Sequence, residues 1–278
     1  MEHLRQPACW SERHKQALQD IAREAGACIL AHRAASTLDT QRKPDGSHVT
    51  AADREAERII LAGLNALTPD IPVVAEEKDN PAHLADGGTY WLVDPLDGTR
   101  DYVEGGDEFS VNIGLVVAHE PCLGVLYAPQ TDDLFYGDPN GALRVNAQGA
   151  HALVPTPPPS AKAAPRLLTS RREARHVPVT EWLLSGEVGL WRACSSAYKF
   201  GLLAAGEFDV FLRTGTTYEW DTAAGDAILR AVGGRIITPD NRPLVYGKPD
   251  FRNGTFIAST GGFGEQRTTD FLALLSRD

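Results

Sequence analysis

Two aspartates stand three residues apart directly after a short apolar run, in the segment YWLVDPLDGT. The apolar run, residues 91–93, predicts a buried strand, and Pro95 and Gly98 predict a turn that carries Asp94 and Asp97. Hard divalent cations such as Mg²⁺ prefer clustered carboxylate and carbonyl oxygens on a rigid support. The segment therefore indicates a cation site at the end of a strand.

Three further acidic positions also stand at the ends of predicted elements, namely Asp53, Glu76 and Asp221. No histidine or cysteine stands beside them in the sequence, which favours magnesium over zinc or copper. If these carboxylates converge, they could hold two cations about 4 Å apart, which would clamp the attacking and leaving oxygens of a phosphoryl group. The sequence alone does not establish that they converge.

Each acid also has an ordinary structural explanation. Asp53 fits the N3 position of a capping box that begins at Thr50. Asp221 would serve as a helix N-cap. Glu76 and Glu77 would begin a solvated loop, and the aspartate pair of the turn would satisfy turn amides.

Hydrophobic periodicity predicts helices and strands that alternate along the chain, as in a layered α/β or α+β body. The proline-rich segment 155–165 predicts a boundary between an N-terminal α+β lobe, residues 1–158, and a C-terminal α/β lobe, residues 159–278, which carries Asp221. The expected helices are residues 11–33, 50–67, 179–185, 197–205, 221–232 and 270–275, and the expected strands are residues 71–75, 91–93, 111–117, 122–127, 134–136, 143–145, 166–170, 208–213, 235–237 and 255–258.

Composition limits the class of protein and of partner. The 278 residues carry a formal charge of −10, which argues against a nucleic-acid polymer as partner but not against a small phosphorylated ligand. The four cysteines have no CxxC spacing, so neither a zinc site nor a disulfide framework is expected. No apolar run reaches about 18 residues and no signal peptide is recognised, so a cytoplasmic location is expected, with peripheral association to the inner membrane left open.

Several blocks of the sequence carry a family resemblance. The blocks DGSHVTAAD, PVVAEE, WLVDPLDGT and WDTAAGDAILRAVGG, in this order, resemble the inositol monophosphatase superfamily of magnesium-dependent, lithium-sensitive phosphatases over roughly residues 10–260. The blocks LTPDIPVVAEE, YWLVDPLDGTRDYV, GVLYAPQ and CSSAYKF are most similar to the bacterial CysQ-type 3′(2′),5′-bisphosphate nucleotidases. The resemblance implies an αβαβα sandwich of the inositol monophosphatase and fructose-1,6-bisphosphatase type, with two to three Mg²⁺ ions per site.

The resemblance also implies which residues hold the metal ions. Glu76, Asp94 and the backbone carbonyl of Leu96 would hold the first Mg²⁺. Asp94, Asp97 and Asp221 would hold the second, and Glu76 would contribute to a third, weaker site.

Other residues would act on water and on phosphate, again by resemblance. Asp53 and Thr99 would orient and deprotonate the attacking water, with no covalent intermediate on the protein. The backbone amides of Gly98 and Thr99 would receive the phosphate, as exposed N–H groups commonly do. Lys43 matches a lysine near a loop that closes on the site.

The substrate-side residues are expected in the second lobe. Lys199 is the strongest candidate. Alternatively, Ser195 and the serine after it only cap a helix, and Lys199 lies on the solvent-exposed face of that helix. Two blocks depart from the subfamily pattern and put substrate identity in doubt: CSSAYKF has Cys194 and Tyr198 where glycine and leucine are more usual, and GTTYEWD replaces a more typical GPTNIWD. The full set of candidates is Ser170, Arg171, Ser195, Lys199 and Arg213.

The predicted activity is hydrolysis of the 3′-phosphate of adenosine 3′,5′-bisphosphate, or of its 5′-phosphosulfate counterpart, in sulfur assimilation. One alternative is hydrolysis of inositol-1-phosphate or a related sugar phosphate at the same site. A haloacid-dehalogenase mechanism is disfavoured because Pro95 stands where the nucleophilic aspartate would be. A non-catalytic metal- or nucleotide-binding protein is disfavoured because every ligand position is present. A homodimer is compatible with the resemblance, but no segment reports on it.

Overall fold

The structure is a computed structural model that describes residues 10–35, 39–43, 48–78, 80, 88–156, 163–175 and 188–263. Its largest sheet has seven strands in chain order, of which the first pair is parallel and the rest form an antiparallel meander. The strands are β3 (Val73–Ala75), β4 (Thr89–Asp97), β5 (Ser110–Val117), β6 (Glu120–Ala128), β7 (Asp133–Asp138), β8 (Gly141–Asn146) and β9 (Gly149–Leu153).

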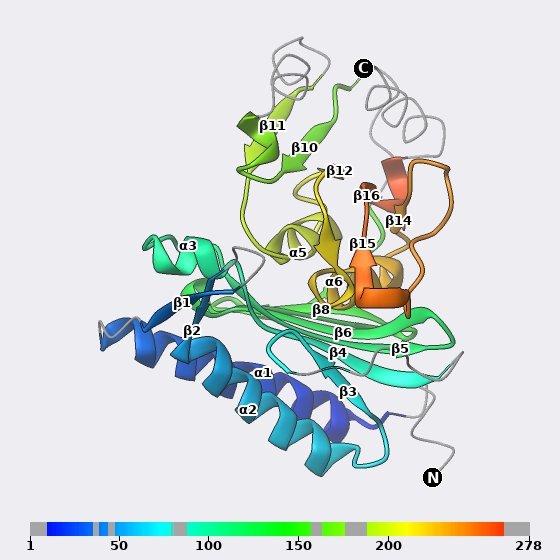
Figure 1. The fold of residues 1–278 in the computed structure, drawn as a ribbon. Helices are drawn as coiled ribbons and strands as arrows, with labels where there is room; N and C mark the ends of the chain where they lie inside the picture. The colour runs from blue at the N-terminus through cyan, green and yellow to red at the C-terminus, as the bar shows by residue number, and fades with distance from the viewer. Residues whose placement is uncertain are drawn as a thin grey trace.

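Two long helices, α1 (Glu12–Ala34) and α2 (Ala51–Leu67), lie side by side on one face of this sheet (Figure 1). Each helix buries one apolar stripe, as its 3.6-residue periodicity predicts. Ser11 stands at the N-cap of α1, and Thr50 caps α2 as expected. A short hairpin of β1 (Thr40–Arg42) and β2 (His48–Thr50) leads directly into α2.

The opposite face is covered by α5 (Tyr198–Ala204) and α6 (Ala223–Ala231), and a second sheet lies beyond them (Figure 1). The predicted layered α/β fold is confirmed, while the helices expected at residues 179–185 and 270–275 lie outside the described residues. The second sheet contains, in spatial order, β11 (Leu190–Ala193), β10 (Arg166–Thr169), β12 (Val210–Arg213), β16 (Phe256–Ser259) and β14 (Arg235–Ile237).

Three glycines form a row across the large sheet where α6 lies on it. Gly114 pairs with Gly124, and Gly124 pairs with Gly137, on the adjacent strands β5, β6 and β7. A Cβ atom at Gly114 would lie 2.8 Å from the Ala223 side chain, and one at Gly137 would lie 2.6 Å from the Ile228 Cα. One at Gly124 would overlap the α6 backbone. The helix therefore rests on the backbone of the sheet.

One hydrophobic core crosses the proposed lobe boundary. Leu92 and Phe135 of the large sheet pack in the same buried cluster as Phe200 of α5 and Ile228 of α6. The division at residue 158 stays a prediction, but the residues on its two sides share this core. Within the described part of the chain, every helix is too short or too polar to cross a membrane.

Two local predictions are wrong. The strand that begins at Thr89 does not stop before Asp94, because β4 continues through an irregular step to Asp97. A short helix, α3 (Thr99–Val103), follows the strand. Asp221 does not cap α6: it ends a separate 3₁₀ turn, Glu219–Asp221, and Thr222 precedes the helix.

Candidate active site

The two aspartates of β4 lie at an irregularity in its pairing with β5, between Asp94 and Asp97. Such irregularities redirect side chains that a regular strand would place on fixed faces. Gly98 follows the strand, and its φ of 91° lies in the left-handed region. A Cβ at this glycine would lie 2.9 Å from the Glu108 carbonyl oxygen, so the turn needs glycine for both its angle and its space.

Asp53 connects the capping of α2 to the turn after β4. Its Oδ2 accepts hydrogen bonds from the backbone N and the hydroxyl of Thr50, at 2.7 and 2.6 Å. Its Oδ1 lies 3.1 Å from the Thr99 hydroxyl, which also lies 2.9 Å from the Leu96 carbonyl. The predicted capping role and the predicted pairing with Thr99 thus use different oxygens of one buried carboxylate.

Glu76 follows β3 and lies between a lysine and an aspartate. Its Oε1 is 2.8 Å from the Lys43 ammonium, which also pairs with Glu77 at 2.6 Å. On its other side, the Glu76 side chain interacts with that of Asp94 and contributes to the raised pKa of the Asp94 carboxyl. Burial raises the pKa of Glu77 to about 7, against the opposing effect of Lys43.

Four of the predicted carboxylates interact electrostatically with one another. The pKa of Asp94 is raised well above its ordinary value, first by burial and then by Glu76, Asp97 and Asp221. The pKa of Asp221 is raised in the same way, by burial and then by Asp97 and Glu76. Acidic residues that are more than 120 positions apart in the chain are therefore close enough to interact electrostatically, as the hypothesis of a shared site requires.

These residues fit a hard divalent cation by donor type and by charge. Among the described residues, no group of three or more His, Cys, Asp or Glu side chains is already arranged as the ligands of one ion. Protein donors engage the carboxylates instead, since Asp94 accepts from the Leu96 N at 3.0 Å and Asp221 from the Tyr218 N at 2.8 Å. Buried carboxylates with raised pKa values are nevertheless stabilised by a cation that brings them together.

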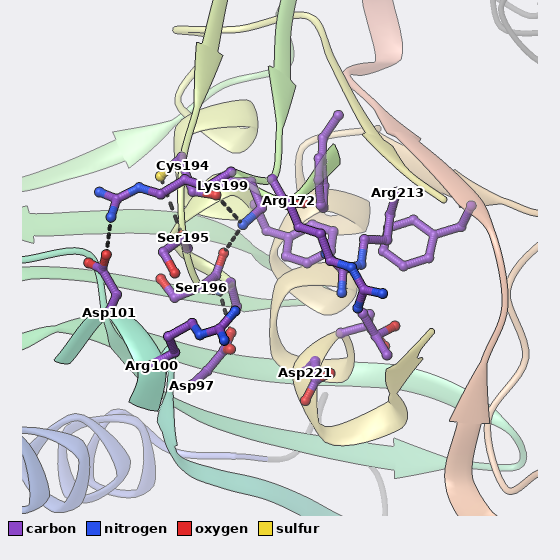
Figure 2. Close-up of a pocket in the computed structure, with 18 of the residues that line it drawn as sticks. Asp97, Arg100, Asp101, Arg172, Cys194, Ser195, Ser196, Lys199, Arg213 and Asp221 are labelled. Carbon is purple, nitrogen blue, oxygen red and sulfur yellow. Dashed lines mark hydrogen bonds and ion pairs between the residues drawn. The ribbon is translucent and has the colours of Figure 1, made fainter. Parts of the chain in front are cut away.

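A pocket of about 640 Å³ adjoins this acidic group (Figure 2). Asp97 and Asp221 line it at the acidic end. Its walls also carry the six cationic side chains Arg100, Arg171, Arg172, Arg175, Lys199 and Arg213.

All five substrate-side candidates line the pocket, although several already have protein partners. Lys199 is buried, and its ammonium donates to the carbonyls of Cys194 at 3.0 Å and of Ser196 at 2.5 Å. The alternative that placed Lys199 on a wet helix face is therefore wrong. Arg171 pairs with Asp101 and with Glu108, the latter at 3.0 Å.

The remaining candidates, Ser195, Ser170 and Arg213, each interact with a glutamate of the protein. The Ser195 N donates to Glu108, and the helix that follows has Ala197, without a side-chain cap, at its N-cap position. Ser170 and Glu173 exchange hydrogen bonds, and Arg213 lies 3.6 Å from Glu173. Lys43 pairs with acids outside the pocket lining, so its predicted contact with substrate stays a prediction.

Three pocket arginines were missed from the sequence, namely Arg100, Arg172 and Arg175. Two signals could have found them. Arg100 directly follows the predicted phosphate turn, and the segment SRREAR places three arginines within five residues. Figure 2 shows Arg100 and Arg172 among the side chains around the pocket.

The two unusual residues of CSSAYKF have different environments. Cys194 lines the pocket. Tyr198 does not: its hydroxyl donates to Asp133 at 2.8 Å and its ring packs edge-on against Phe135. Of these two substitutions, only the one at Cys194 bears on the shape of the pocket.

Comparisons with known proteins agree with this geometry. Residues 10–274 match the model of the inositol monophosphatase family. The chain is 38% identical over 229 residues to a 3′(2′),5′-bisphosphate nucleotidase CysQ of Salmonella typhimurium, which covers 81% of this chain and 91% of the relative.

Solved structures are similar as well. The crystal structure of CysQ from Bacteroides thetaiotaomicron, a bacterial member of the inositol monophosphatase family, matches with a TM-score of 0.75 and 31% identity over 91% of this chain and 98% of that one. An inositol monophosphatase structure from Anabaena matches with a TM-score of 0.72 and 26% identity over 94% of each chain.

Proposed function

The chain belongs to the inositol monophosphatase family, and from this premise we propose that it hydrolyses a phosphate monoester of a nucleoside bisphosphate. The substrate is adenosine 3′,5′-bisphosphate, and the products are AMP and inorganic phosphate. One observation carries the choice of substrate: six cationic side chains share a pocket with Asp97 and Asp221. A substrate with two phosphates would place the reacting phosphate beside the acidic residues and their metal ions, and the second phosphate beside the cationic side chains.

Magnesium is the cofactor that the acidic group suits, with Glu76, Asp94, the Leu96 carbonyl, Asp97 and Asp221 as its ligands. When bound, Mg²⁺ supplies Lewis acidity that promotes deprotonation of water and offsets charge on the phosphoryl oxygens. Raised pKa values of buried carboxylates, as at Asp94 and Asp221, support this assignment because they indicate a deficit of positive charge.

Asp53 and Thr99 act on the attacking water. The Thr99 hydroxyl orients the water, and the Asp53 Oδ1, 3.1 Å from that hydroxyl, accepts the proton. The second Asp53 oxygen is fixed by Thr50, so the carboxylate cannot turn away without breaking the start of α2. The amides of Gly98 and Thr99 receive the phosphate that is attacked.

The remote phosphate binds at the cationic end. Arg213, Lys199 and Arg172 line this end, although Arg213 also lies 3.6 Å from Glu173 and Arg171 is shared with Asp101. Ser170 and Ser195 contribute polar lining. Hydrogen bonds between arginine and phosphate are both strong and directional, which suits selection between one and two phosphates.

A phosphatase for inositol-1-phosphate or a related sugar phosphate is the second candidate, since it would need the same acidic group. The similarity to the Anabaena inositol monophosphatase structure favours it. It leaves the cationic end of the pocket without a ligand, and for that reason it ranks second. A non-catalytic binding protein ranks third, because the Asp53 and Thr99 pair is intact.

Phosphate release from adenosine 3′,5′-bisphosphate and from inositol-1-phosphate tests the proposal at equal concentrations, with Mg²⁺ present and after its removal by EDTA. We expect the nucleotide to be preferred by about tenfold or more, since binding of a charged second phosphate contributes roughly 1.5–3 kcal/mol. A tenfold preference for the inositol ester would overturn the choice of substrate. Turnover that survives EDTA would overturn the metal assignment.

A further inference from the structure

Asp221 differs from the other proposed metal ligands in how the chain supports it. Asp94 and Asp97 belong to β4, a central strand, and Glu76 directly follows β3. Asp221 ends a single 3₁₀ turn, Glu219–Asp221. One such turn has little stability of its own, so other groups must fix its position.

Asn253 is a side chain that reaches both ends of this turn. It is 1% exposed and comes from β15 (Arg252–Asn253), which pairs with β13 (Thr217–Tyr218) directly before the turn. Its Nδ2 donates to the Tyr218 carbonyl at 2.9 Å and to the Thr222 hydroxyl at 3.0 Å. Tyr218 immediately precedes the turn and Thr222 immediately follows it, so one amide group joins the two.

The acceptors around Asn253 determine which way its amide faces. With Oδ1 in the place of Nδ2, an acceptor would oppose the Tyr218 carbonyl. The Oδ1 atom itself is buried and has no hydrogen-bond partner among the described residues. The side chain therefore contributes its two N–H donors to the fold, and nothing described here uses its acceptor.

Of the two bonded residues, Tyr218 reaches Asp221 directly and Thr222 reaches the turn that carries it. The Tyr218 N donates to the Asp221 Oδ2 at 2.8 Å, and the Thr222 hydroxyl donates to the Glu219 carbonyl at 3.2 Å. A shift of Tyr218 would move the group that orients the Asp221 carboxylate. Asn253 thus acts on Asp221 through two residues; it does not itself line the pocket, although its partner Thr222 does.

We propose that Asn253 is a positioning residue for Asp221, and that by joining Tyr218 to Thr222 it holds the Asp221 carboxylate where Mg²⁺ binds. The inference rests on the proposed metal site. Groups behind a metal ligand commonly change metal affinity by about 10- to 100-fold when they are removed.

Asn253→Leu tests the proposal, since leucine has nearly the same shape as asparagine but neither a hydrogen-bond donor nor an acceptor. Mg²⁺ binding is measured by isothermal titration calorimetry without substrate, at a temperature well below unfolding. We expect the affinity to fall by about tenfold or more. Thr222→Val removes one of the two acceptors and should weaken Mg²⁺ binding by a smaller factor.

Ile257→Val, a truncation of a buried side chain in β16, is the matched control for loss of stability. It should lower the melting temperature and leave Mg²⁺ affinity unchanged. Wild-type Mg²⁺ affinity in Asn253→Leu would overturn the inference, and if that variant does not fold, wild-type affinity in Thr222→Val would overturn it. A wild-type chain that binds no Mg²⁺ would overturn the proposed metal dependence, which is a separate failure.

Discussion

At its acidic end the pocket is bordered by carboxylates from β4 and one 3₁₀ turn, whereas the cationic side chains come from α3, α5, β12 and the segment after β10. Asp94 is 1% exposed and accepts a backbone hydrogen bond within its own strand. The Arg100 side chain is 73% exposed and that of Arg171 is 48% exposed. On the proposed function, the chemical step belongs to the acidic end and the choice of substrate to the more exposed cationic end.

Of the variants considered, Asp94→Asn in the acidic end should reduce catalysis most. We expect kcat/KM to fall by about 1000-fold, the scale on which loss of one preorganised electrostatic group acts. The fold should persist, because the pKa of Asp94 is raised by burial and by neighbouring acids, and a neutral amide relieves that repulsion. Steady-state kinetics and thermal unfolding measure the two effects, and an active variant would contradict the metal assignment.

Asp226 is a buried carboxylate that, unlike those of the acidic end, is paired with a protein cation: Arg230 lies 3.0 Å away. The variant Asp226→Asn tests how such a paired carboxylate behaves. Burial raises the pKa of Asp226 from 3.8 to about 6. The folded chain then binds the proton more tightly than the unfolded chain, so this contribution to stability is complete below about pH 4 and is lost as the pH rises through about 6.

The unfolding free energy of the wild type, relative to that of Asp226→Asn, should therefore fall by about 3 kcal/mol between about pH 4 and pH 7. Denaturant titrations at both pH values measure it. Subtracting the unfolding free energy of Asp226→Asn from that of the wild type removes the contribution of the other acidic groups, because both proteins contain them. A difference that does not change with pH would show that Arg230 and Tyr246 keep this carboxylate ionised over the whole range.

Arg172→Gln tests the cationic end. We expect KM for adenosine 3′,5′-bisphosphate to rise by about tenfold, since a charged hydrogen bond is lost. Hydrolysis of adenosine 3′-monophosphate, which lacks the remote phosphate, should not change. Arg192→Gln is the matched control, because Arg192 pairs with Glu108 and does not line the pocket. Equal losses on both substrates would place Arg172 in the chemical step.

Tyr198→Phe should have the smallest effect. It removes the hydroxyl that donates to Asp133 and should cost about 1 kcal/mol of unfolding free energy. Turnover should remain at the wild-type level, because Tyr198 lies outside the pocket lining. A changed preference between substrates would mean that this residue shapes the pocket after all.

The sequence predicted the acidic end better than the cationic end, and the reason is physical. Apolar runs and helix caps are local patterns, and they placed Asp53 and Glu76 at the ends of elements that the structure contains, and Asp94 on a strand that in fact continues to Asp97. The step within β4 was missed because a strand irregularity depends on the partner strand.

Contacts between segments that are far apart in the chain have no local sequence pattern by which they could be predicted. Arg171 meets Asp101, 70 positions away, and Tyr198 meets Asp133, 65 positions away. Asn253 stands in an ordinary polar segment, and only the fold brings it to the turn that carries Asp221. Most ionic partners of the cationic end are of this long-range kind, and the resemblance to relatives did not supply them.

The row of Gly114, Gly124 and Gly137 has a consequence for how this protein can vary. Because α6 meets sheet backbone at these three positions, no side chain of β5, β6 or β7 separates it from the sheet there. A single added methyl group in this row would push against the helix that begins two residues after Asp221, so these three positions require glycine.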